Sequence, residues 1–434
     1  MNIFSKHILL AIIVFFGSIF NLSCQSSANT ADIEKSIDKI FAGFDHSNIP
    51  GAAVAVMQND EIVFKKGYGS ANLEYDIPVT PKTVFHIASV SKQFTVFALL
   101  LLAEEGMLSL DDPIQKHIAE VPDFGQEITL RHLATHTSGM RDQWDLLNLA
   151  GWRWDDVITK EHILKMVSRQ EELNFTPGEQ YMYCNTGFTL LAEVVARVSG
   201  KSFAEFTRKR IFTPLNMTNS QFYDDHQRIV KNRAYSYYPW TFGYQKSVLS
   251  YANVGATSLF TTVEDLSLWA MNFKTLKVGS KAIVDQMNTL AILNNGETFG
   301  GAYGQFVGPY KGLQQIQHSG GDAGYRSYLG RFPDQDFAVS VFSNNGSSNP
   351  AALALQVADL FLKDAFIEEP EPIKKEEKTI SLNETALKAF EGHYWDTKDG
   401  YSRKIHVKGG SLQYDWGNGN VTELAPLDKN TFKM

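Results

Sequence analysis

Short apolar stretches rich in β-branched and aromatic residues, interrupted by polar turn residues, predict two β-hairpins, one at each end of a long central region. The first joins Gly51–Met57 to Glu61–Tyr68 through Asn59-Asp60, and the second joins Tyr325–Phe332 to Phe337–Phe342. β-Branched and aromatic runs separated by turn-forming residues are typical of such hairpins. We expect both hairpins to lie in one antiparallel sheet.

The region between the hairpins combines helical segments with loops and predicts a mainly helical lobe inserted into the sheet. The expected fold class is therefore α+β, an antiparallel sheet flanked by helices, with catalytic groups in the cleft between sheet and lobe. A helix predicted over Ala351–Phe361 follows the second hairpin. We assign residues 30–367 to this domain.

A change in composition after that helix predicts a second, smaller domain. Residues 368–381 form the predicted linker, because Glu368–Lys378 is rich in Glu, Pro and Lys. Strands are expected over Arg403–Lys408 and Ser411–Asp415. Residues 382–434 would then form part of a small β-domain, whose open edge would need to be covered.

The first 24 residues have the pattern of an export signal. An apolar run from Ile8 to Phe20 spans about 13 residues, fewer than the roughly 20 that cross a bilayer as a helix. Cys24 follows in a setting similar to a bacterial lipoprotein processing site, with Asn21 where such sites usually carry Leu. We expect residues 1–24 to be a signal peptide, cleaved either with lipidation of Cys24 and membrane anchoring or without it. A buried N-terminal helix is the alternative.

Composition indicates a folded protein and argues against a nucleic-acid partner. The chain has 434 residues, 44% of them hydrophobic and 20% charged, as in globular proteins of two or three domains. A net charge of −8 disfavours the neutralisation of phosphates. Beyond Cys24 the sequence contains only Cys184, so no intrachain disulfide is expected in the mature chain.

Ser89 and Lys92 are the first candidates for catalysis. Residues three apart lie on one face of a helix, and a lysine whose pKa is lowered by burial can take the proton of a serine hydroxyl. Ser36 and Lys39 have the same spacing, but Ser89 precedes the apolar segment Phe94–Ala103 and should begin a buried helix. Unpaired N–H groups at such a position can stabilise an anion. A helix cap near a solvated lysine is the alternative.

Later stretches add polar side chains that could reach the same cleft. Tyr183 and Asn185 stand at the entry of an apolar helix and offer a phenol and an amide. His318, followed by Gly320-Gly321, supplies an imidazole and flexible backbone before the last hairpin. The segment Tyr251-Ala252-Asn253 repeats the Tyr-x-Asn spacing.

In order and spacing these stretches resemble the three motifs of serine β-lactamases and penicillin-binding proteins, written Ser-x-x-Lys, Tyr-x-Asn, and Lys-Thr-Gly or His-x-Gly. The likeness covers about Ile33–Leu362 and is greatest for the class C β-lactamase-related branch. Tyr251 falls in a stretch that is structural in this family, so we assign the second motif to Tyr183. Connecting segments add to the resemblance: Leu133–Met140, Pro214–Met217 and Thr261–Leu266.

The resemblance implies acyl transfer without a metal or other cofactor. Ser89 would attack a carbonyl while Lys92 and Tyr183 share its proton, and the N–H groups of Ser89 and Gly321 would hold the oxyanion. Tyr183 would also activate the water that releases the acyl group, which requires its pKa to fall from about 10. A glycine at position 321, next to Gly320, would let the strand approach substrate closely.

The remaining roles follow from the same resemblance. Asn185 would orient Lys92 or the substrate amide. His318 replaces the lysine of better-known lactamases, which weakens the case for recognition of a substrate carboxylate. Cys184 is expected to be small and buried, and His136 to be structural. Aromatic residues that could border the cleft or pack in the lobe are Trp144, Trp152 and Trp154.

The expected protein is thus an exported serine hydrolase of the periplasm or cell envelope, acting on a small molecule or short peptide. D-alanyl-D-alanine carboxypeptidase, D-amino-acid peptidase and carboxylesterase activities share this chemistry, and a β-lactamase is the alternative. A catalytically idle protein that binds penicillin or wall fragments is the alternative outside the enzymes. The motifs do not separate these activities.

Overall fold

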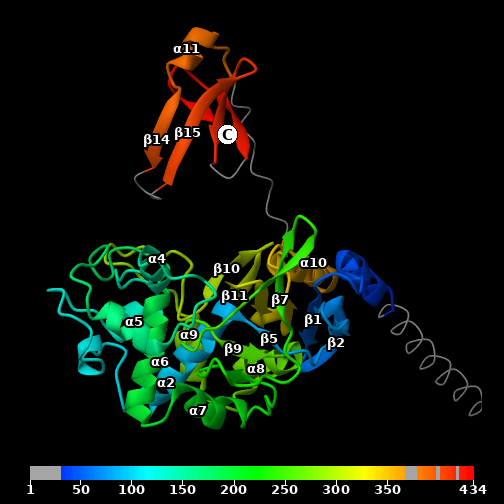
Figure 1. Cartoon of the computed structure of the whole chain (residues 1–434), viewed down its shortest axis with the longest axis vertical. Helices are drawn as coiled ribbons and strands as arrows, with labels where there is room; N and C mark the ends of the chain where they lie inside the picture. Colours follow the sequence, from blue (N-terminus) through cyan, green and yellow to red (C-terminus); the bar gives the residue numbers. More distant parts are fainter. Residues whose placement is uncertain (1–30, 368–378, 397–400, 417–419) are drawn as a thin grey trace, which may run out of the picture. The chain divides into compact units, whose positions relative to one another are not determined.

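The computed structural model describes residues 31–367, 379–396, 401–416 and 420–434 (Figure 1). The chain divides into two compact units, residues 1–367 and 368–434. The predicted signal peptide, Cys24 and residues 368–378 of the predicted linker lie outside the described residues. Across the described ranges, no helix has both the length and the apolarity to cross a membrane.

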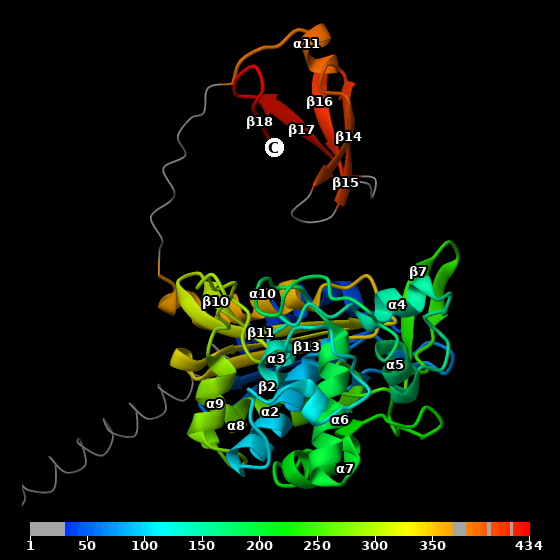
Figure 2. The same ribbon diagram turned by 90° about the vertical axis from the view of Figure 1, so that its left-hand side faces the viewer.

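A six-stranded antiparallel sheet forms the centre of the first unit. Its strands are β1 (Ala52–Gln58), β2 (Glu61–Tyr68), β10 (Phe306–Tyr310), β11 (Leu313–Asp322), β12 (Tyr325–Phe332) and β13 (Phe337–Ser343). They lie in the order β10-β11-β12-β13-β1-β2, and β1 pairs with β13 from Ala52 opposite Ser343 to Gln58 opposite Phe337. Figure 2 labels β10, β11, β13 and β2 of this sheet. The prediction that the early and late hairpins share one sheet is confirmed.

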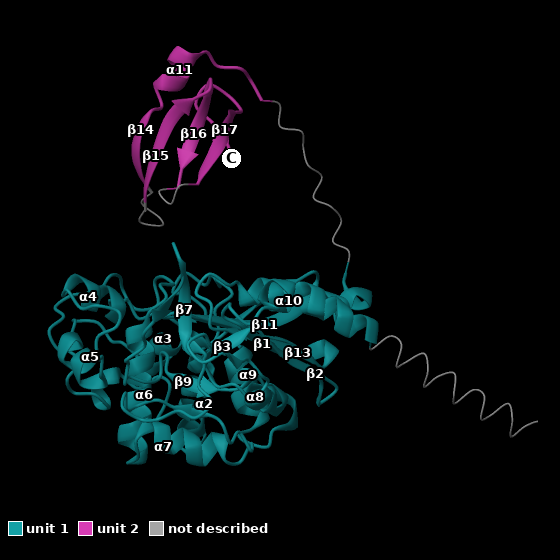
Figure 3. Cartoon of the chain, turned by 45° about the vertical axis from the view of Figure 1, so that its right-hand side comes forward, with its two compact units in different colours: residues 1–367 teal, residues 368–434 magenta. Residues whose placement is uncertain are grey.

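Both faces of this sheet are buried, with helices on either side. Figure 3 shows α10 (Pro350–Leu362) on one side of the strands and α8 (Val263–Thr275) on the other. Because side chains alternate across a strand, a strand between two cores must be apolar throughout. In β1 the side chains alternate between two hydrophobic cores: one contains Ala53, Ala55 and Met57, and the other Ala52, Val54 and Val56.

The segment between β2 and β10 supplies the predicted helical lobe. Its other helices are α2 (Ser91–Glu104), α3 (Leu130–Ala134), α4 (Gln143–Leu149), α5 (Lys160–Val167), α6 (Asn185–Ser199), α7 (Phe203–Thr207) and α9 (Lys281–Asn288). Short helical turns in this unit are η1 (Ala42–Phe44), η2 (Ala88–Val90), η3 (Ile114–Lys116), η4 (Arg208–Phe212), η5 (Pro333–Gln335) and η6 (Lys363–Ala365). Small sheets pair β3 (Ser70–Asn72) with β4 (Ile77–Pro78), β9 (Leu259–Thr261) with β5 (Phe85–His86) and β6 (Gln221–Phe222), and β7 (Ser236–Trp240) with β8 (Gly243–Ser247).

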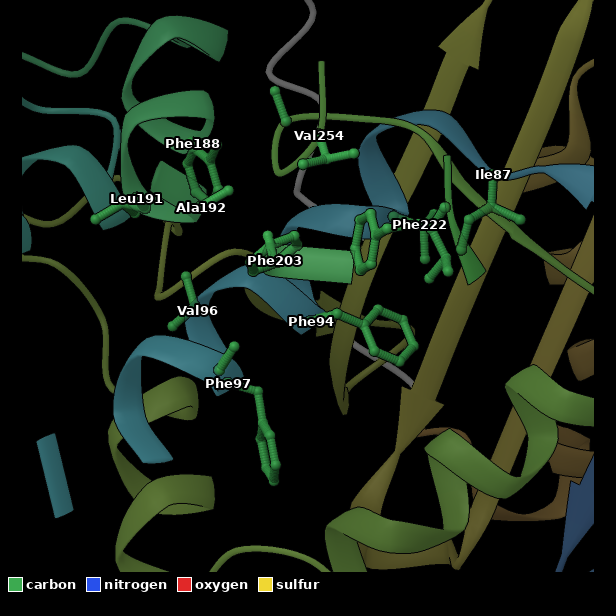
Figure 4. Close-up of a cluster of buried hydrophobic side chains, with 14 of the residues drawn as sticks. Ile87, Phe94, Val96, Phe97, Phe188, Leu191, Ala192, Phe203, Phe222 and Val254 are labelled. Atoms are coloured by element: carbon green, nitrogen blue, oxygen red, sulfur yellow. The ribbon is translucent and has the colours of Figure 1, made fainter. Parts of the chain in front are cut away.

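Helix α2 is buried along most of its length, which explains its almost continuous apolar sequence. Phe94 stacks on Trp269 of α8 with 4.1 Å between ring centroids. Figure 4 shows Phe94 and Phe97 of α2 in one apolar cluster with Phe188 of α6. Because the helix has no solvated face near its start, the Lys92 side chain is held in the interior.

The second unit is a small β structure with its own core. Strands β14 (Gly392–Asp396), β15 (Tyr401–Lys408), β16 (Ser411–Asp415), β17 (Val421–Pro426) and β18 (Phe432–Lys433) follow one another in an antiparallel sheet, after the helix α11 (Glu384–Lys388). The strands predicted over residues 403–408 and 411–415 lie in β15 and β16. The core is formed by Leu387, Leu412 and Leu424.

Candidate active site

Ser89 lies in the short turn η2 that leads directly into α2, and it is partly exposed. Ala88 before it has a φ of 46°, in the left-handed region that residues with a Cβ seldom adopt. The Ala88 N–H donates to Nδ1 of buried His86 at 3.2 Å, and Ser327 Oγ donates to Ile87 O at 2.7 Å. These contacts hold a strained turn in place, as is common at functional sites.

Lys92 is fully buried among oxygen atoms. Its Nζ lies 2.8 Å from Asn185 Oδ1, 2.8 Å from Ala256 O and 3.1 Å from Ser89 Oγ. Burial lowers the pKa of Lys92 to about 7, although nearby carboxylates act to raise it. The two carbonyl oxygens only accept hydrogen bonds. A neutral amine therefore donates its two N–H groups to them and directs its lone pair at the Ser89 hydroxyl.

Asn185 is the first residue of α6, and its amide is fixed by an acidic neighbour. Asp142 Oδ2 accepts from the Asn185 backbone N–H at 2.5 Å and from Nδ2 at 3.0 Å. Asp142 Oδ1 also accepts from the N–H of Trp144 at 2.8 Å and so caps α4. With Nδ2 turned toward this carboxylate, Asn185 Oδ1 faces Lys92. The contact corresponds to one of the two roles expected for Asn185.

Tyr183 lies just before α6, beside the other two residues. Lys92 Nζ is 4.8 Å from the centroid of its ring, and His136 stacks on the ring at 4.1 Å between centroids. Burial raises the pKa of Tyr183, and a hydrogen bond with Ser89 opposes the rise only in part. The expectation of a lowered phenol pKa was wrong, because desolvation outweighs the hydrogen bond with Ser89. Tyr183 is a neutral phenol at neutral pH.

Strand β11 forms the opposite wall of the site. Its alternate residues His318, Gly320 and Asp322 point to one face, because side chains alternate along a strand. A Cβ placed on Gly320 would lie 2.4 Å from Ile87 O and 3.0 Å from Ser89 N. Only glycine therefore lets this strand approach the backbone of the nucleophile.

Gly321 does not share this steric constraint within the protein. A Cβ there would meet the side chain of Arg326 at 3.5 Å or more, which is ordinary contact. A steric requirement for glycine within the protein is thus found at Gly320, while the expectation that Gly321 lets the strand approach substrate stays a prediction. The roles of Ser89 and Gly321 N–H as oxyanion donors stay predictions.

His318 is buried and offers an acceptor to the site. Its Nδ1 lies 2.6 Å from Ser319 O, so the proton is on Nδ1 and Nε2 carries a lone pair. Burial lowers the pKa of His318 to about 3, and the charge of Lys92 contributes to this shift. Among the residues that the structure describes, Nε2 has no hydrogen-bond partner. His318 is therefore a neutral imidazole with an unused acceptor.

A cleft of about 710 Å³ opens over Ser89. Trp144, which borders it, lies 4.9 Å from Tyr251 and 6.2 Å from Trp154 between ring centroids. The third candidate tryptophan, Trp152, packs on His162 instead. The cleft brings motif residues together with aromatic and charged side chains: Tyr183, Asn185, Gly321, Trp144, Trp154, Tyr238, Tyr251, Asp322 and Arg326.

Comparison with known proteins gives the family. The family model described as Beta-lactamase matches residues 37–362, most of the chain. The chain belongs to the beta-lactamase family. It is a serine hydrolase of this family, and its fold and motif order agree with the resemblance drawn from the sequence.

Individual relatives of this beta-lactamase-family chain include peptidases and penicillin-binding proteins. It is similar to penicillin-binding protein 4* of Bacillus subtilis, with 26% identity over 422 residues that cover 92% of this chain and 91% of that protein. D-aminopeptidase of Gluconobacter oxydans is 26% identical over 401 residues, covering 90% and 71%. The octameric penicillin-binding protein homologue from Pyrococcus abyssi superposes with a TM-score of 0.69 at 28% identity, covering 91% of this chain and 90% of that one. D-amino acid amidase of Ochrobactrum anthropi shares the fold, with a TM-score of 0.66 at 21% identity, covering 77% and 99%.

Asp322 is a residue of the cleft that sequence reasoning missed. Its Oδ2 accepts from Thr257 Oγ1 at 2.7 Å, and the Tyr251 hydroxyl and Ala323 N–H also bond to the carboxylate. Burial raises the pKa of Asp322 to about 6. Tyr251 is thus a partner of Asp322, while Asn253 of the second Tyr-x-Asn segment is fully buried. The only sequence signal for Asp322 was its position two residues after Gly320.

His136 and Cys184 are the immediate neighbours of Tyr183 in the interior. His136 Nδ1 accepts from the Cys184 N–H at 2.9 Å while its ring stacks on Tyr183. Burial raises the pKa of Cys184 to about 12, so it stays a thiol. Among the described residues, no group of three or more His, Cys, Asp or Glu side chains could hold a metal ion.

Proposed function

We propose that the chain is an exported serine hydrolase that cleaves an amide or ester bond of a D-amino-acid compound through an acyl-serine intermediate on Ser89. The observation that carries the proposal is the position of Lys92 Nζ, 3.1 Å from Ser89 Oγ, with its other contacts made to carbonyl oxygens. A buried amine is costly for folding, and a pKa near neutrality suits a general base.

Acylation uses the neutral Lys92 amine. Ser89 Oγ attacks the substrate carbonyl carbon and gives its proton to Lys92 Nζ. The negative oxygen that forms is stabilised by the N–H groups of Ser89 and Gly321. When the bond to the leaving group breaks, the leaving nitrogen or oxygen takes a proton from the Tyr183 hydroxyl, and Lys92 returns a proton to Tyr183.

Deacylation runs through the same groups in reverse. A water molecule attacks the ester carbonyl and gives its proton to Lys92 by way of Tyr183, and the bond to Ser89 Oγ breaks with return of that proton to the serine. Because burial keeps Tyr183 a neutral phenol, it passes protons and does not act as the base itself. Asn185 keeps the Lys92 amine in place throughout.

Two kinds of observation favour D-amino-acid compounds over penicillins as substrates. The relatives include a D-aminopeptidase, and the fold neighbours a D-amino acid amidase. His318 is neutral where better-known lactamases have a lysine, so it lacks the charge that would attract the carboxylate of a β-lactam. A β-lactamase remains the second candidate because the acyl-serine chemistry is shared.

The proposal is tested by the intact mass of the protein after reaction with a fluorophosphonate and, separately, with a fluorescent penicillin. We expect a fluorophosphonate adduct on the wild type and on Ser36→Ala, the matched control with the same motif spacing, and none on Ser89→Ala. Hydrolysis of D-alanine p-nitroanilide should follow the same pattern. A penicillin adduct that decays within seconds would favour the β-lactamase. No adduct with either reagent would point to the idle binding protein and contradict the proposal.

Export is supported by the sequence of residues 1–24. Fractionation of cells that express the full chain should find the enzyme in the cell envelope. Replacement of Cys24 by Ser should release it to the soluble periplasmic fraction if lipid holds it at a membrane. Retention of the full-length chain in the cytoplasm would contradict the export proposal.

A further inference from the structure

Asp322 stands close to the place where the substrate carbonyl must lie. Gly320 contacts the backbone of Ser89, and Asp322 is two residues further along the same face of β11. Two residues of a strand span about 6.6 Å. A carboxylate at that distance can reach a substituent one or two bonds from the carbonyl carbon that Ser89 attacks.

The Asp322 carboxylate is bonded only to neutral donors in the described part of the chain. These are the Thr257 hydroxyl, the Tyr251 hydroxyl and the Ala323 N–H, and no salt bridge involves this residue there. The three short contacts of Lys92 Nζ go to other atoms. A carboxylate that is desolvated in a cleft and bonded only to neutral donors costs free energy of folding, and a bound cation offsets this cost.

Two aromatic residues of the cleft that contains Asp322 suit a cation. Trp144 and Trp154 border the cleft, and aromatic faces attract ammonium groups. Arg326, the other charged side chain of the lining, donates to Ala323 O, Tyr325 O and Tyr238 Oη. These three neutral acceptors take three of its five N–H groups and fix the guanidinium in place.

His318 completes the pattern on the other side of Gly320. Its Nε2 is a buried acceptor without a partner among the described residues. Strand β11 thus carries a carboxylate and a neutral acceptor two residues to either side of Gly320, which contacts the backbone of the nucleophile. Both groups bind hydrogen-bond donors, and neither attracts a substrate carboxylate.

From this arrangement we infer that Asp322 binds a free ammonium group on the acyl part of the substrate, next to the scissile carbonyl. The inference rests on the proposed function and specifies its substrate: an amide or ester of an amino acid, or of a peptide with a free amino terminus. The enzyme then releases the N-terminal residue, and acylation of that amine removes the charge that Asp322 recognises.

Asp322 could instead serve only as a counter-charge for Lys92, and the two roles predict different results. A counter-charge affects Ser89 with every reagent. An ammonium anchor affects only substrates that carry the amine. A pair of substrates that differ in this one group therefore separates the roles.

The test compares kcat/KM for D-alanine p-nitroanilide and N-acetyl-D-alanine p-nitroanilide in the wild type, Asp322→Asn and Asp334→Asn. Asp334 is an exposed carboxylate in the turn between β12 and β13 and serves as the matched control. In the wild type and in Asp334→Asn we expect kcat/KM to be roughly 100-fold higher for the substrate with the free amine than for the acetylated one. In Asp322→Asn this ratio should fall below about tenfold, mainly because the KM for the free amine rises. Fluorophosphonate labelling of Ser89 shows that each variant is folded.

Several results would overturn the inference. If the wild type hydrolyses the acetylated substrate as fast as the free amine or faster, the inference is wrong whatever the variants do. It is also wrong if Ser89 reacts with the fluorophosphonate but the enzyme does not hydrolyse the substrate with the free amine. If Asp322→Asn lowers kcat/KM by the same factor for both substrates, Asp322 acts as a counter-charge for Lys92. Failure of Ser89 to react with the fluorophosphonate would instead reject the proposed function.

Discussion

Ser36-Ile37-Asp38-Lys39 and Ser89-Val90-Ser91-Lys92 have the same spacing in different surroundings. In the N-terminal helical segment, residues 31–40, Ser36 Oγ donates to Asp32 O at 2.8 Å, and the Lys39 side chain is exposed. In η2 and α2 the lysine is 0% exposed, and its Nζ lies 3.1 Å from the serine oxygen. Spacing alone therefore places the two groups on one face, while burial supplies the reactivity.

The comparison also shows which neighbours matter. Lys92 is surrounded by fixed acceptors, Asn185 Oδ1 and Ala256 O, that come from segments remote in sequence. The exposed Lys39 side chain is surrounded by solvent instead of fixed acceptors. A serine and a lysine thus become a nucleophile and a base only where the fold excludes water and fixes the amine.

The largest expected effect comes from removal of the buried amine. Lys92→Ala should lower kcat for D-alanine p-nitroanilide about 10³-fold or more, because the base is lost. Lys39→Ala should stay within about twofold of the wild type. Steady-state kinetics near pH 7.5 checks both. A Lys92→Ala enzyme that keeps a tenth of the activity would mean that another group is the base.

The same burial predicts a pH-dependent stability. The pKa of Lys92 is about 7 in the folded protein and 10.5 for a free lysine, so between these values the unfolded chain binds more protons. The free energy of unfolding of the wild type should therefore rise with pH relative to Lys92→Met, by up to about 1.4 kcal/mol per unit between pH 7 and 10. Urea unfolding at several pH values measures the difference. Lys39→Met, the exposed counterpart, should show no such trend.

A smaller effect is expected from the charge of Asp142. This carboxylate acts to raise the pKa of Lys92, so Asp142→Asn should move the acid limb of the rate profile to lower pH by less than one unit. The rate near pH 6 should rise a few-fold. Asp145→Asn, an exposed change on the same helix, is the control. A shift to higher pH would contradict the electrostatic account.

The smallest change in activity and stability is expected from replacement of Ser36. Ser36→Ala removes one exposed hydrogen bond to Asp32 O and should change the free energy of unfolding by about 0.5 kcal/mol or less. Urea unfolding and kinetics at one pH suffice to check it. A marked loss of activity would show that the N-terminal helix contributes to the site.

Much of the fold was predictable because its signals are local. The short apolar runs Gly51–Met57 and Tyr325–Phe332, each next to turn residues, predicted strands that the structure contains as β1 and β12. The shared sheet was predicted as the simplest arrangement of the early and late strands, and β1 pairs with β13 in the structure. Ser89 and Lys92 were predicted from their spacing and chemistry, and Tyr183 from the resemblance to the three-motif family; the structure brings the three side chains together.

The rest of the site depends on contacts that no short stretch of sequence contains. Asp142 lies 43 residues before its partner Asn185, and Asp322 binds Thr257 from 65 residues away. The direction of the pKa shift of Tyr183 depends on how much solvent the lobe excludes. Desolvation of this kind is a property of the packed structure.

The central claim, that neutral Lys92 is the base for Ser89, is tested most directly by the pH dependence of fluorophosphonate labelling. The reagent has no ionisable group, so the second-order rate constant reports the enzyme alone. The account predicts a rate that rises with pH through a main ionisation with a midpoint of about 7. Asp322, with a pKa of about 6, adds at most a smaller step below it, and His318, with a pKa of about 3, adds no step above pH 5. A rate that is flat from pH 5 to 9, or that rises only near pH 10, would contradict it.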